Sequence, residues 1–395
     1  MFKPLDIARF ALGSVAKAAA KVPVVESRFA ISDRLNGPWP EGPFLWLHGA
    51  SLGECRMLLN LARFLQEDVE NCPKILITTQ KTEVLKFLKE AGEGISACIA
   101  PADAPSTMRS FISKVKPVGL ILGENEFWPG YLSSMKRFSK RPSVAVVSGR
   151  YRRSFPGVDF SCVGFASMQT GGDLSRFLNV ASRANIDQMM IGGDWKILPW
   201  VRSGKSVSAP ENPSVDTVFV SMHMAEWASL CRMVVSSIKR QESVVLIPRR
   251  LNEVNAFRNA LSEQELTVVE WPLVQKGAVS IVNRFGLTKD VFAVSRTAIV
   301  GGSFCRGLGV HDFWEPLQMG VATCVGPFAA GQKEAVASLV NAGVIAQLQS
   351  TAGYAKRNLP DPRIVSTFLA NERTKVSDSY EHLVKFIENL VEQRQ

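Results

Sequence analysis

The stretch Phe44-Leu-Trp-Leu-His48-Gly-Ala-Ser-Leu-Gly-Glu54 predicts a strand, a tight turn and the start of a helix. Phe44 to Leu47 are apolar and form the strand, and small residues follow it. Ser51 is the expected N-cap, because its hydroxyl can accept from a backbone N–H of the first helical turn. The helix is expected from about Leu52, with one apolar face formed by Leu58, Leu61, Ala62 and Leu65.

Glu54 is the first candidate functional residue of this stretch. In a parallel α/β sheet the loops at the carboxyl ends of strands face the ligand crevice, so His48, Ser51 and Glu54 are expected at the mouth of a site. Glu54 lies in the first helical turn, where the helix dipole favours the ionised carboxylate. With few cations nearby in the sequence, it could act as a general base. Glutamates at this position also stabilise helices without further function, and position alone does not separate these two interpretations.

The composition is that of a soluble globular enzyme, with 46% apolar and 21% charged residues. The 395 residues fit two domains of ordinary size, and the net charge of +10 favours anionic partners such as nucleotide phosphates or anionic lipid. Basic residues are dispersed, which argues against nucleic acid. The seven cysteines form no CxxC pair, and the four histidines show no HExxH spacing, so neither a zinc site nor another protein-built metal centre is expected.

The N-terminal segment allows two interpretations. Leu5, Ala8, Ala11, Leu12 and Val15 recur at helical spacing among basic residues. Residues 1–25 are therefore either a basic amphipathic helix on an anionic membrane surface or a helix packed on its own domain. Charged residues interrupt the segment, which disfavours a signal peptide, and no apolar run in the chain is long enough to span a membrane as an ordinary helix.

Strands and helices alternate along the chain in two series. The first has strands at 44–47, 74–79, 97–100, 118–122 and 143–147, with helices at 82–91 and 106–115 between them. After a Pro-, Ser- and Gly-rich linker at 196–213, the second has strands at 217–221, 243–247, 266–270, 297–300 and 321–325, with helices at 225–239 and 253–261. From Ser350 the chain reads as helical. This rhythm predicts parallel sheets in two Rossmann-like domains, 1–205 and 206–395, facing a central cleft.

Several motifs follow strands of these series. Glycines in Gly301-Gly-Ser303 would let the backbone approach an anionic group, and Arg249 after Pro248 is a plausible phosphate ligand, although each signal alone is weak. His223 and Glu226 follow a strand as well, and either touch a donor molecule or cap a helix.

The order of the motifs resembles that of the 3-deoxy-D-manno-octulosonic acid (Kdo) transferases, from about Trp46 to about Val344. The sharpest matches are the SxGE turn, which contains Ser51, Gly53 and Glu54, and the ExExWP motif, which begins at Glu124. The other matching segments are Ser148-Gly-Arg150, Lys196, Ser221-Met-His223 with Glu226, Pro248-Arg249, Phe285-Gly286-Leu287, Gly301-Gly302-Ser303, Asp312-Phe313-Trp314-Glu315 and Gly326-Pro327.

The resemblance implies the glycosyltransferase B fold and a metal-independent, inverting transfer of Kdo from CMP-Kdo to a lipid A precursor in lipopolysaccharide core biosynthesis. Glu54 matches the general base, Glu124 an assisting carboxylate, and Lys196 a cation that stabilises the leaving donor. Acceptor binding is expected at Ser51, Gly53, Glu126 and Arg150, although Glu124 could also serve only there. Donor binding is expected at Pro248, Arg249, Phe285, Gly286, Leu287, Gly301, Gly302, Ser303, Asp312, Phe313, Trp314 and Glu315. No cofactor is implied beyond the donor CMP-Kdo. The implied place is the cytoplasmic face of a bacterial inner membrane, with peripheral or N-terminal attachment.

The chain departs from the family pattern along the donor loops. Arg250 stands in place of a histidine, Asp312 in place of an asparagine, and Leu287 in place of an acidic residue. Arg250 and Asp312 could compensate one another. The departures leave two alternatives open: a glycosyltransferase on the same scaffold with another nucleotide sugar or acceptor, and a non-catalytic relative that binds lipid or nucleotide.

Overall fold

The computed structural model describes residues 30–152, 158–181, 188–349 and 359–392. The chain divides into two compact units, one comprising residues up to Ser203 together with those from Glu372, the other Gly204–Asn371. The predicted membrane-surface helix at 1–25 lies outside the described residues. Within the part of the chain that is described, no helix is long and apolar enough to cross a membrane.

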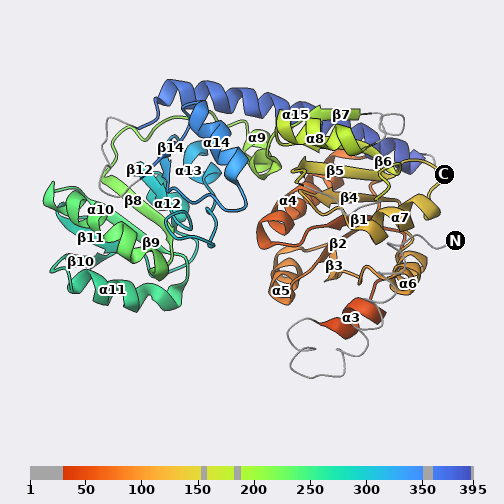
Figure 1. Cartoon of the computed structure of the whole chain (residues 1–395), viewed down its shortest axis with the longest axis horizontal. Helices are drawn as coiled ribbons and strands as arrows, with labels where there is room; N and C mark the ends of the chain where they lie inside the picture. The colour runs from red at the N-terminus through yellow and green to blue at the C-terminus, as the bar shows by residue number, and fades with distance from the viewer. Residues whose placement is uncertain (1–29, 153–157, 182–187, 350–358, 393–395) are drawn as a thin grey trace. The chain divides into compact units, whose positions relative to one another are not determined.

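The first unit contains a sheet of seven parallel strands in the order β3-β2-β1-β4-β5-β6-β7 (Figure 1). The strands are β1 (Leu45–His48), β2 (Ile75–Thr79), β3 (Ser96–Ile99), β4 (Gly119–Gly123), β5 (Val144–Gly149), β6 (Val163–Met168) and β7 (Gln188–Ile191). The helices are α3 (Ile31–Asn36), α4 (Leu52–Asp68), α5 (Thr82–Ala91), α6 (Pro105–Val115), α7 (Pro129–Phe138), α8 (Gly171–Val180) and α9 (Leu198–Arg202), with a 3-10 turn η2 (Trp195–Ile197). Strands β1, β2, β4 and β5 are buried along their whole length, as expected for a sheet covered on both faces.

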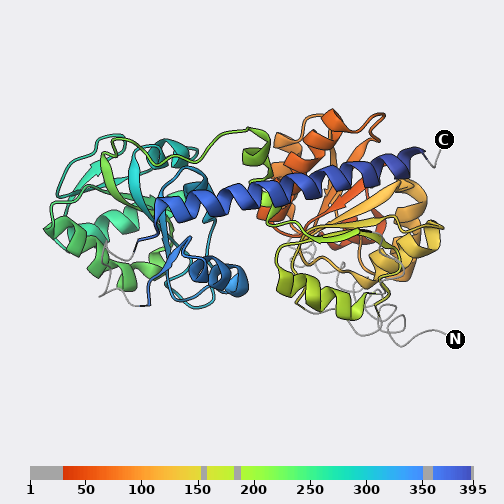
Figure 2. The same ribbon diagram turned by 90° about the horizontal axis from the view of Figure 1, so that it is seen from above.

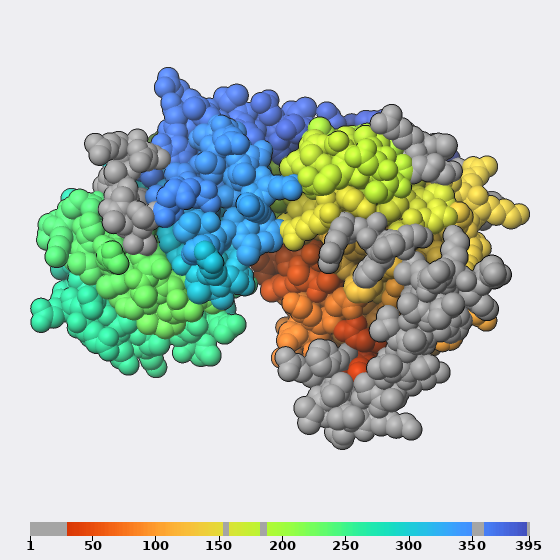
Figure 3. Space-filling model, viewed as in Figure 1, coloured from red at the N-terminus to blue at the C-terminus, as the bar shows by residue number. Residues whose placement is uncertain are grey.

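The second unit repeats this architecture, with the parallel order β10-β11-β9-β8-β12-β13-β14. Its strands are β8 (Val215–Met222), β9 (Val244–Pro248), β10 (Thr267–Glu270), β11 (Ala278–Ile281), β12 (Ser295–Val300), β13 (Ala322–Val325) and β14 (Ala346–Gln347). Its helices are α10 (Trp227–Lys239), α11 (Val254–Ser262), α12 (Thr288–Phe292), α13 (Trp314–Gln318) and α14 (Lys333–Asn341), with 3-10 turns η3 (Met224–Glu226) and η4 (Leu251–Glu253). The outer faces of α10 and α11 belong to the green surface in Figure 3. The predicted α/β class with two parallel sheets is confirmed.

The last helix, α15 (Pro362–Glu392), is a single element drawn in blue in Figure 2. The sequence analysis assigned the terminal helices to the second domain, but α15 is divided between the units from Glu372 on. Val376, Leu383 and Ile387 are fully buried, and the Tyr380 hydroxyl donates to Asp68 of α4 at 2.6 Å. Burial of this apolar stripe explains why the end of the chain packs with the first unit.

The predicted linker at 196–213 begins too early. Trp195, Ile197 and Leu198 are buried, and η2 and α9 pack against α4. Irregular chain follows only after α9, up to the start of β8. The composition, rich in Pro and Ser, gave no sign of η2 and α9, which are ordered by tertiary packing.

Each sheet has a switch point, where neighbouring strands are followed by connections that leave in opposite directions along the sheet. In the first sheet it lies between β1 and β4, and in the second between β8 and β12. Ligands of open α/β sheets bind at the carboxyl ends of the strands at such points. A ligand is therefore expected near the residues that follow His48, Gly123, Met222 and Val300.

Candidate functional site

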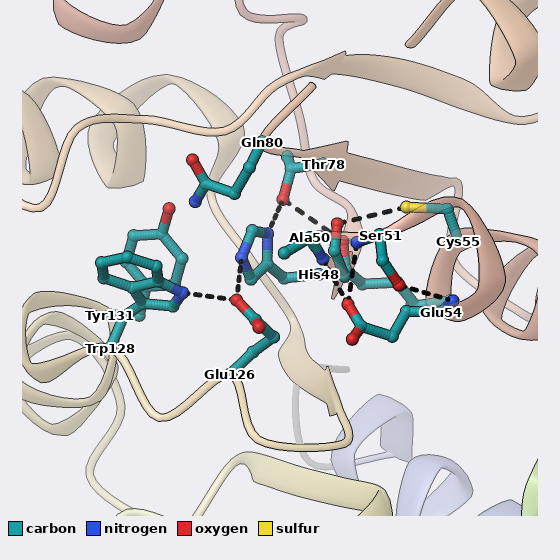
Figure 4. A network of polar contacts seen from close by, with 12 residues as sticks. His48, Ala50, Ser51, Glu54, Cys55, Thr78, Gln80, Glu126, Trp128 and Tyr131 are labelled. Carbon is teal, nitrogen blue, oxygen red and sulfur yellow. Dashed lines mark hydrogen bonds and ion pairs between the residues drawn. The ribbon is translucent and has the colours of Figure 1, made fainter. Parts of the chain in front are cut away.

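The turn after β1 fixes Glu54 by a capping box at the start of α4. The Glu54 carboxylate oxygen Oε2 accepts from the backbone N–H of Ala50 at 2.6 Å and of Ser51 at 2.9 Å (Figure 4). The Ser51 hydroxyl accepts in return from the Glu54 N–H at 3.3 Å. The predicted N-cap is confirmed, and the helix-stabilising interpretation of Glu54 applies as well. The other oxygen, Oε1, accepts no hydrogen bond from any residue that the structure describes, so a held carboxylate keeps one oxygen for a ligand.

Glu126 is held by two aromatic N–H donors. Its Oε2 lies 3.3 Å from His48 Nε2 and accepts from the Trp128 indole at 2.7 Å, and Figure 4 shows the carboxylate between these rings. Burial alone would raise the pKa of the Glu126 carboxyl. The contacts with His48 and Trp128 lower this pKa by more than burial raises it, so it lies below its ordinary value. Glu126 is therefore ionised at neutral pH.

His48 is fully buried and is fixed from its other side by Thr78. The Thr78 hydroxyl accepts from the Trp46 indole and lies 2.8 Å from His48 Nδ1, whereas its contact with the Leu47 carbonyl is 3.4 Å. The Nε2 atom on the other side of the ring faces Glu126 Oε2 at 3.3 Å, so His48 links strand β2 to the loop after β4.

Glu124 differs from Glu126 because it is neutralised by cations. Its Oε1 lies 2.7 Å from Lys196 Nζ, its Oε2 contacts the Arg150 guanidinium, and its side chain is 4% exposed. Glu124 adopts a left-handed backbone with φ of 50°, which turns the chain sharply at the end of β4. A buried carboxylate with two cationic partners is a poor proton acceptor, so the geometry favours a positioning role over an acid–base role for Glu124.

Lys196 is placed by the buried polar groups Asp194 and Ser148. Asp194 Oδ1 accepts from the Lys196 N–H at 3.1 Å, and the Ser148 hydroxyl accepts from the Trp195 N–H at 3.1 Å and donates to Asp194. The position of a Cβ on Gly53 would lie 3.7 Å from Lys196 Cε, so the lysine lies beside the SxGE turn. The expectation of few cations near Glu54 is therefore wrong, because Lys196 reaches this turn from η2.

In the second unit, Glu226 holds the Gly-Gly-Ser loop in place. Its carboxylate accepts from the backbone N–H groups of His223 at 3.0 Å, Gly302 at 2.9 Å and Phe304 at 3.0 Å, and it is fully buried. The Gly302 N–H, which belongs to the loop expected to approach an anion, is therefore already occupied by a carboxylate of the chain itself. The capping interpretation of Glu226 fits these contacts.

The glycines of this loop serve close packing of the backbone. A Cβ on Gly301 would lie 2.3 Å from the Ser221 carbonyl oxygen, and one on Gly302 would lie 2.1 Å from that of Gly309. The Ser303 hydroxyl donates to the Val300 carbonyl and accepts from the Gly326 N–H at 2.8 Å. These glycines are required by the approach of neighbouring loops, and the Ser303 hydroxyl is used inside the fold.

Two histidines meet at the second switch point. His223 follows β8 and His311 follows β12, and their Nε2 atoms lie 2.8 Å apart with the rings stacked at 5.0 Å. Arg249 follows β9, its N–H donates to the Met222 carbonyl, and its side chain is exposed. Of the predicted donor residues, Pro248, Arg249 and Gly301 to Ser303 thus lie at the carboxyl ends of β9 and β12, the two strands that flank β8, and the histidine pair lies with them.

The remaining predicted donor residues lie elsewhere or are buried. Phe285, Gly286 and Leu287 follow β11, which β9 separates from β8, and Phe285 is 79% exposed. Phe313 and Trp314 are 1% and 6% exposed, so their side chains form part of the core rather than a binding surface, contrary to the sequence interpretation. Asp312 is exposed and accepts from the Trp314 N–H, and Glu315 lies in the first turn of α13.

Sequence reasoning missed Thr78 and Asp194, and it gave no orienting role to Trp128 and Ser148, although both stand in matched motifs. Thr78 and Trp128 contact His48 and Glu126, Asp194 accepts from the Lys196 N–H, and Ser148 donates to Asp194. The available signal was the position of Thr78 near the end of a buried strand and that of Asp194 two residues before Lys196. No group of three or more His, Cys, Asp or Glu residues in the described ranges is arranged to hold a metal ion.

Comparison with known proteins places the chain among distant relatives. The family model described as 3-deoxy-D-manno-octulosonic-acid transferase (kdotransferase) matches residues 24–186. A 3-deoxy-D-manno-octulosonic acid transferase of Chlamydia pneumoniae is 24% identical over 334 residues, covering 77% of this chain and 74% of the relative. One of Aquifex aeolicus is 26% identical over 292 residues, covering 72% and 76%. The resemblance predicted from the motifs is confirmed.

The fold has solved counterparts as well. The structure of a UDP-GlcNAc 2-epimerase from Neisseria meningitidis bound to UDP-GlcNAc aligns with a TM-score of 0.52 at 13% identity, over 87% of this chain and 99% of that one. At this identity the likeness concerns the fold alone. The predicted glycosyltransferase B type of architecture is confirmed.

Proposed function

We propose that this chain is a glycosyltransferase that transfers Kdo from CMP-Kdo to a hydroxyl group of a lipid A precursor, with inversion at the anomeric carbon. The observation that carries the proposal is the set of three carboxylates at the first switch point, each held by different partners. Relatives named Kdo transferases, matching over most of the chain, support the choice of sugar.

Glu54 is the proposed general base. Its Oε2 is fixed by two backbone N–H groups, and Oε1 remains to accept the proton of an acceptor hydroxyl. The acceptor oxygen forms a bond to the anomeric carbon as the bond from that carbon to the CMP phosphate oxygen breaks. CMP departs with the electron pair, and a single displacement of this kind inverts the anomeric centre.

The other carboxylates of the first unit position the substrates. Glu126, with Oε2 occupied by His48 and Trp128, presents Oε1 to acceptor hydroxyls. Lys196 makes one ion pair with Glu124 and keeps further N–H donors for the anionic donor sugar. Arg249 in the second unit binds the phosphate of CMP as a charge-assisted partner.

A mass-spectrometric assay with CMP-Kdo and a tetraacylated lipid A precursor tests donor, acceptor and the number of sugars transferred together. We expect a product heavier than the precursor by one or more Kdo residues, dependent on both substrates. A chain that binds CMP without forming this product would contradict the proposed acceptor or the activity itself.

The net charge of +10 suits an anionic lipid surface, and the proposed place of action is the cytoplasmic face of an inner membrane, with peripheral attachment.

One observation favours a second candidate, a different nucleotide sugar on the same scaffold. Arg250 and Asp312, two departures from the family pattern, are both exposed at the carboxyl edge of the second sheet. Thermal stabilisation measured with CMP, CMP-Kdo, UDP and GDP separates the candidates. Stabilisation by UDP or GDP but not by CMP would favour the second.

A further inference from the structure

The second switch point contains a direct contact between two imidazoles. His223 Nε2 and His311 Nε2 lie 2.8 Å apart, so one ring donates its proton and the other accepts it. The rings come from the loops after β8 and β12, the two adjacent strands of the switch point. His223 is 9% exposed, whereas His311 is half-buried and Arg249 is exposed. The pair therefore lies just below the surface where a ligand of this sheet is expected.

Burial, together with the nearby arginines, disfavours a charged imidazole in the free protein. Burial lowers the pKa of His223; Glu226 and Glu253 oppose this effect, and Arg250 and Arg249 add to it. Burial, Arg249 and His223 lower the pKa of His311 to about 4. Glu226 is already committed to three backbone N–H groups, and Asp312 beside His311 accepts from the Trp314 N–H.

We propose that His223, His311 and Arg249 bind the phosphate group of a nucleotide ligand, and that the imidazole pair takes up one proton from solvent as the phosphate binds. The nature of the ligand rests on the proposed function; the proton uptake goes beyond it. A phosphate beside Arg249 compensates the cation that disfavours a charged imidazole, so protonation becomes favourable.

The contact between the rings sets the stoichiometry. In the neutral pair one Nε2–H already points at the other Nε2, so an added proton goes to the Nδ1 atom of the donating ring. The Nε2 contact then persists, and the charged ring gains an N–H donor. A second proton would place two Nε2–H groups opposite each other, so the pair takes up at most one proton per phosphate bound.

Calorimetric titration of the full chain with CMP near neutral pH, in two buffers of very different ionisation enthalpy, measures this uptake. The comparison protein is His311→Gln, which lacks the second imidazole; it subtracts the protons that CMP itself exchanges. We expect the natural chain to take up more protons than the variant, by no more than one. We also expect its CMP affinity to fall by up to about tenfold per pH unit as the pH rises, against a flatter dependence in the variant.

His382→Gln is the matched control, because His382 is partly exposed on α15 and its ring bonds to the Asp378 carbonyl, away from the second switch point. It should behave like the natural chain. If His311→Gln does not fold, His223→Gln replaces it. Equal proton uptake by the natural chain and the folded variant would overturn the inference while leaving the proposed transfer intact. Failure of the natural chain to bind CMP at all would overturn both.

Discussion

The two sheets are alike around their switch points, where β2-β1-β4-β5 of the first corresponds to β9-β8-β12-β13 of the second, but the charged residues at these points differ. At the first, three carboxylates are held apart by different donors: backbone N–H groups at Glu54, aromatic N–H groups at Glu126, and cations at Glu124. At the second, the Glu226 carboxylate already accepts hydrogen bonds from backbone N–H groups inside the fold. The neutral pair of His223 and His311 lies there with the exposed side chains of Arg249 and Arg250. The first edge can accept protons and bind hydroxyls, and the second can bind anions. The same local arrangement of strands around a switch point thus supports two different chemistries through the residues at its loops.

The largest effect should come from replacing Glu54, the proposed general base at the carboxyl edge of the first sheet. Glu54→Gln should lower kcat by about 10²- to 10⁴-fold, because an amide cannot take the acceptor proton. Glutamine can still accept from the backbone in a capping box, so the unfolding midpoint and CMP affinity should stay near those of the natural chain. Kinetics with CMP-Kdo and a lipid A precursor check this, and near-normal turnover would exclude Glu54 as the base.

Removing the Glu226 carboxylate at the carboxyl edge of the second sheet should instead affect stability. Glu226→Ala leaves three buried backbone N–H groups without their acceptor, and each unsatisfied group costs about 1–3 kcal/mol. We expect a loss of several kcal/mol in the free energy of unfolding, measured by urea denaturation. Glu263→Ala, an exposed side chain just after α11, is the control and should change stability little. An equally small loss for Glu226→Ala would contradict its structural role.

The ion pair of Glu124 and Lys196 tests how much pairing with a cation stabilises a carboxylate of the first sheet. Glu124→Gln and Lys196→Met should each destabilise the first unit by about 2–3 kcal/mol, less than for a fully buried pair because Lys196 is partly exposed. The double variant should lose less than the sum of the two, with a coupling of about 1–2 kcal/mol. Additive losses in urea denaturation would show that the two side chains do not stabilise each other.

A smaller effect is expected at the cap of α4. Ser51→Ala removes the acceptor of the Glu54 N–H and should lower the free energy of unfolding by about 1 kcal/mol. Ser51→Thr keeps a hydroxyl and should retain most of this stability. Because the cap also fixes the turn that carries Glu54, kcat should fall with Ser51→Ala more than with Ser51→Thr. Identical kcat values in the two variants would separate the cap from catalysis.

The last prediction concerns the pH dependence of stability at the histidine pair. The pKa of His311 is lowered to about 4 in the folded chain from an ordinary value of 6.5. Between these values the unfolded chain binds more protons than the folded one, so the contribution of His311 to stability is present above pH 6.5 and is lost as the pH falls toward 4. His311→Gln should therefore reduce the loss of stability between pH 7 and pH 5, measured by the urea midpoint; an unchanged loss would contradict the shift.

Much of the fold followed from local pattern. Helix α5 was predicted with its observed bounds, and the strands β1, β2, β4, β5, β8, β9, β12 and β13 were predicted within one or two residues, because each is an apolar run between turn residues. Strands β6, β7 and β11 and helices α7 and α14 were not predicted. Their apolar residues are few or interrupted, and neighbours in the tertiary structure stabilise them.

The sequence by itself determined the two α/β series, the cap at Ser51 and the set of motifs that resembles the Kdo transferases, since these depend on residues close together in the chain. Only the tertiary structure decided what the motif residues contact. It pairs Glu124 with Lys196 across 72 positions (196 − 124), brings His223 to His311, and gives the N–H groups of the Gly-Gly-Ser loop to Glu226. Such contacts depend on which strands are neighbours, and strand order is fixed by packing across the whole sheet rather than by any local run of residues.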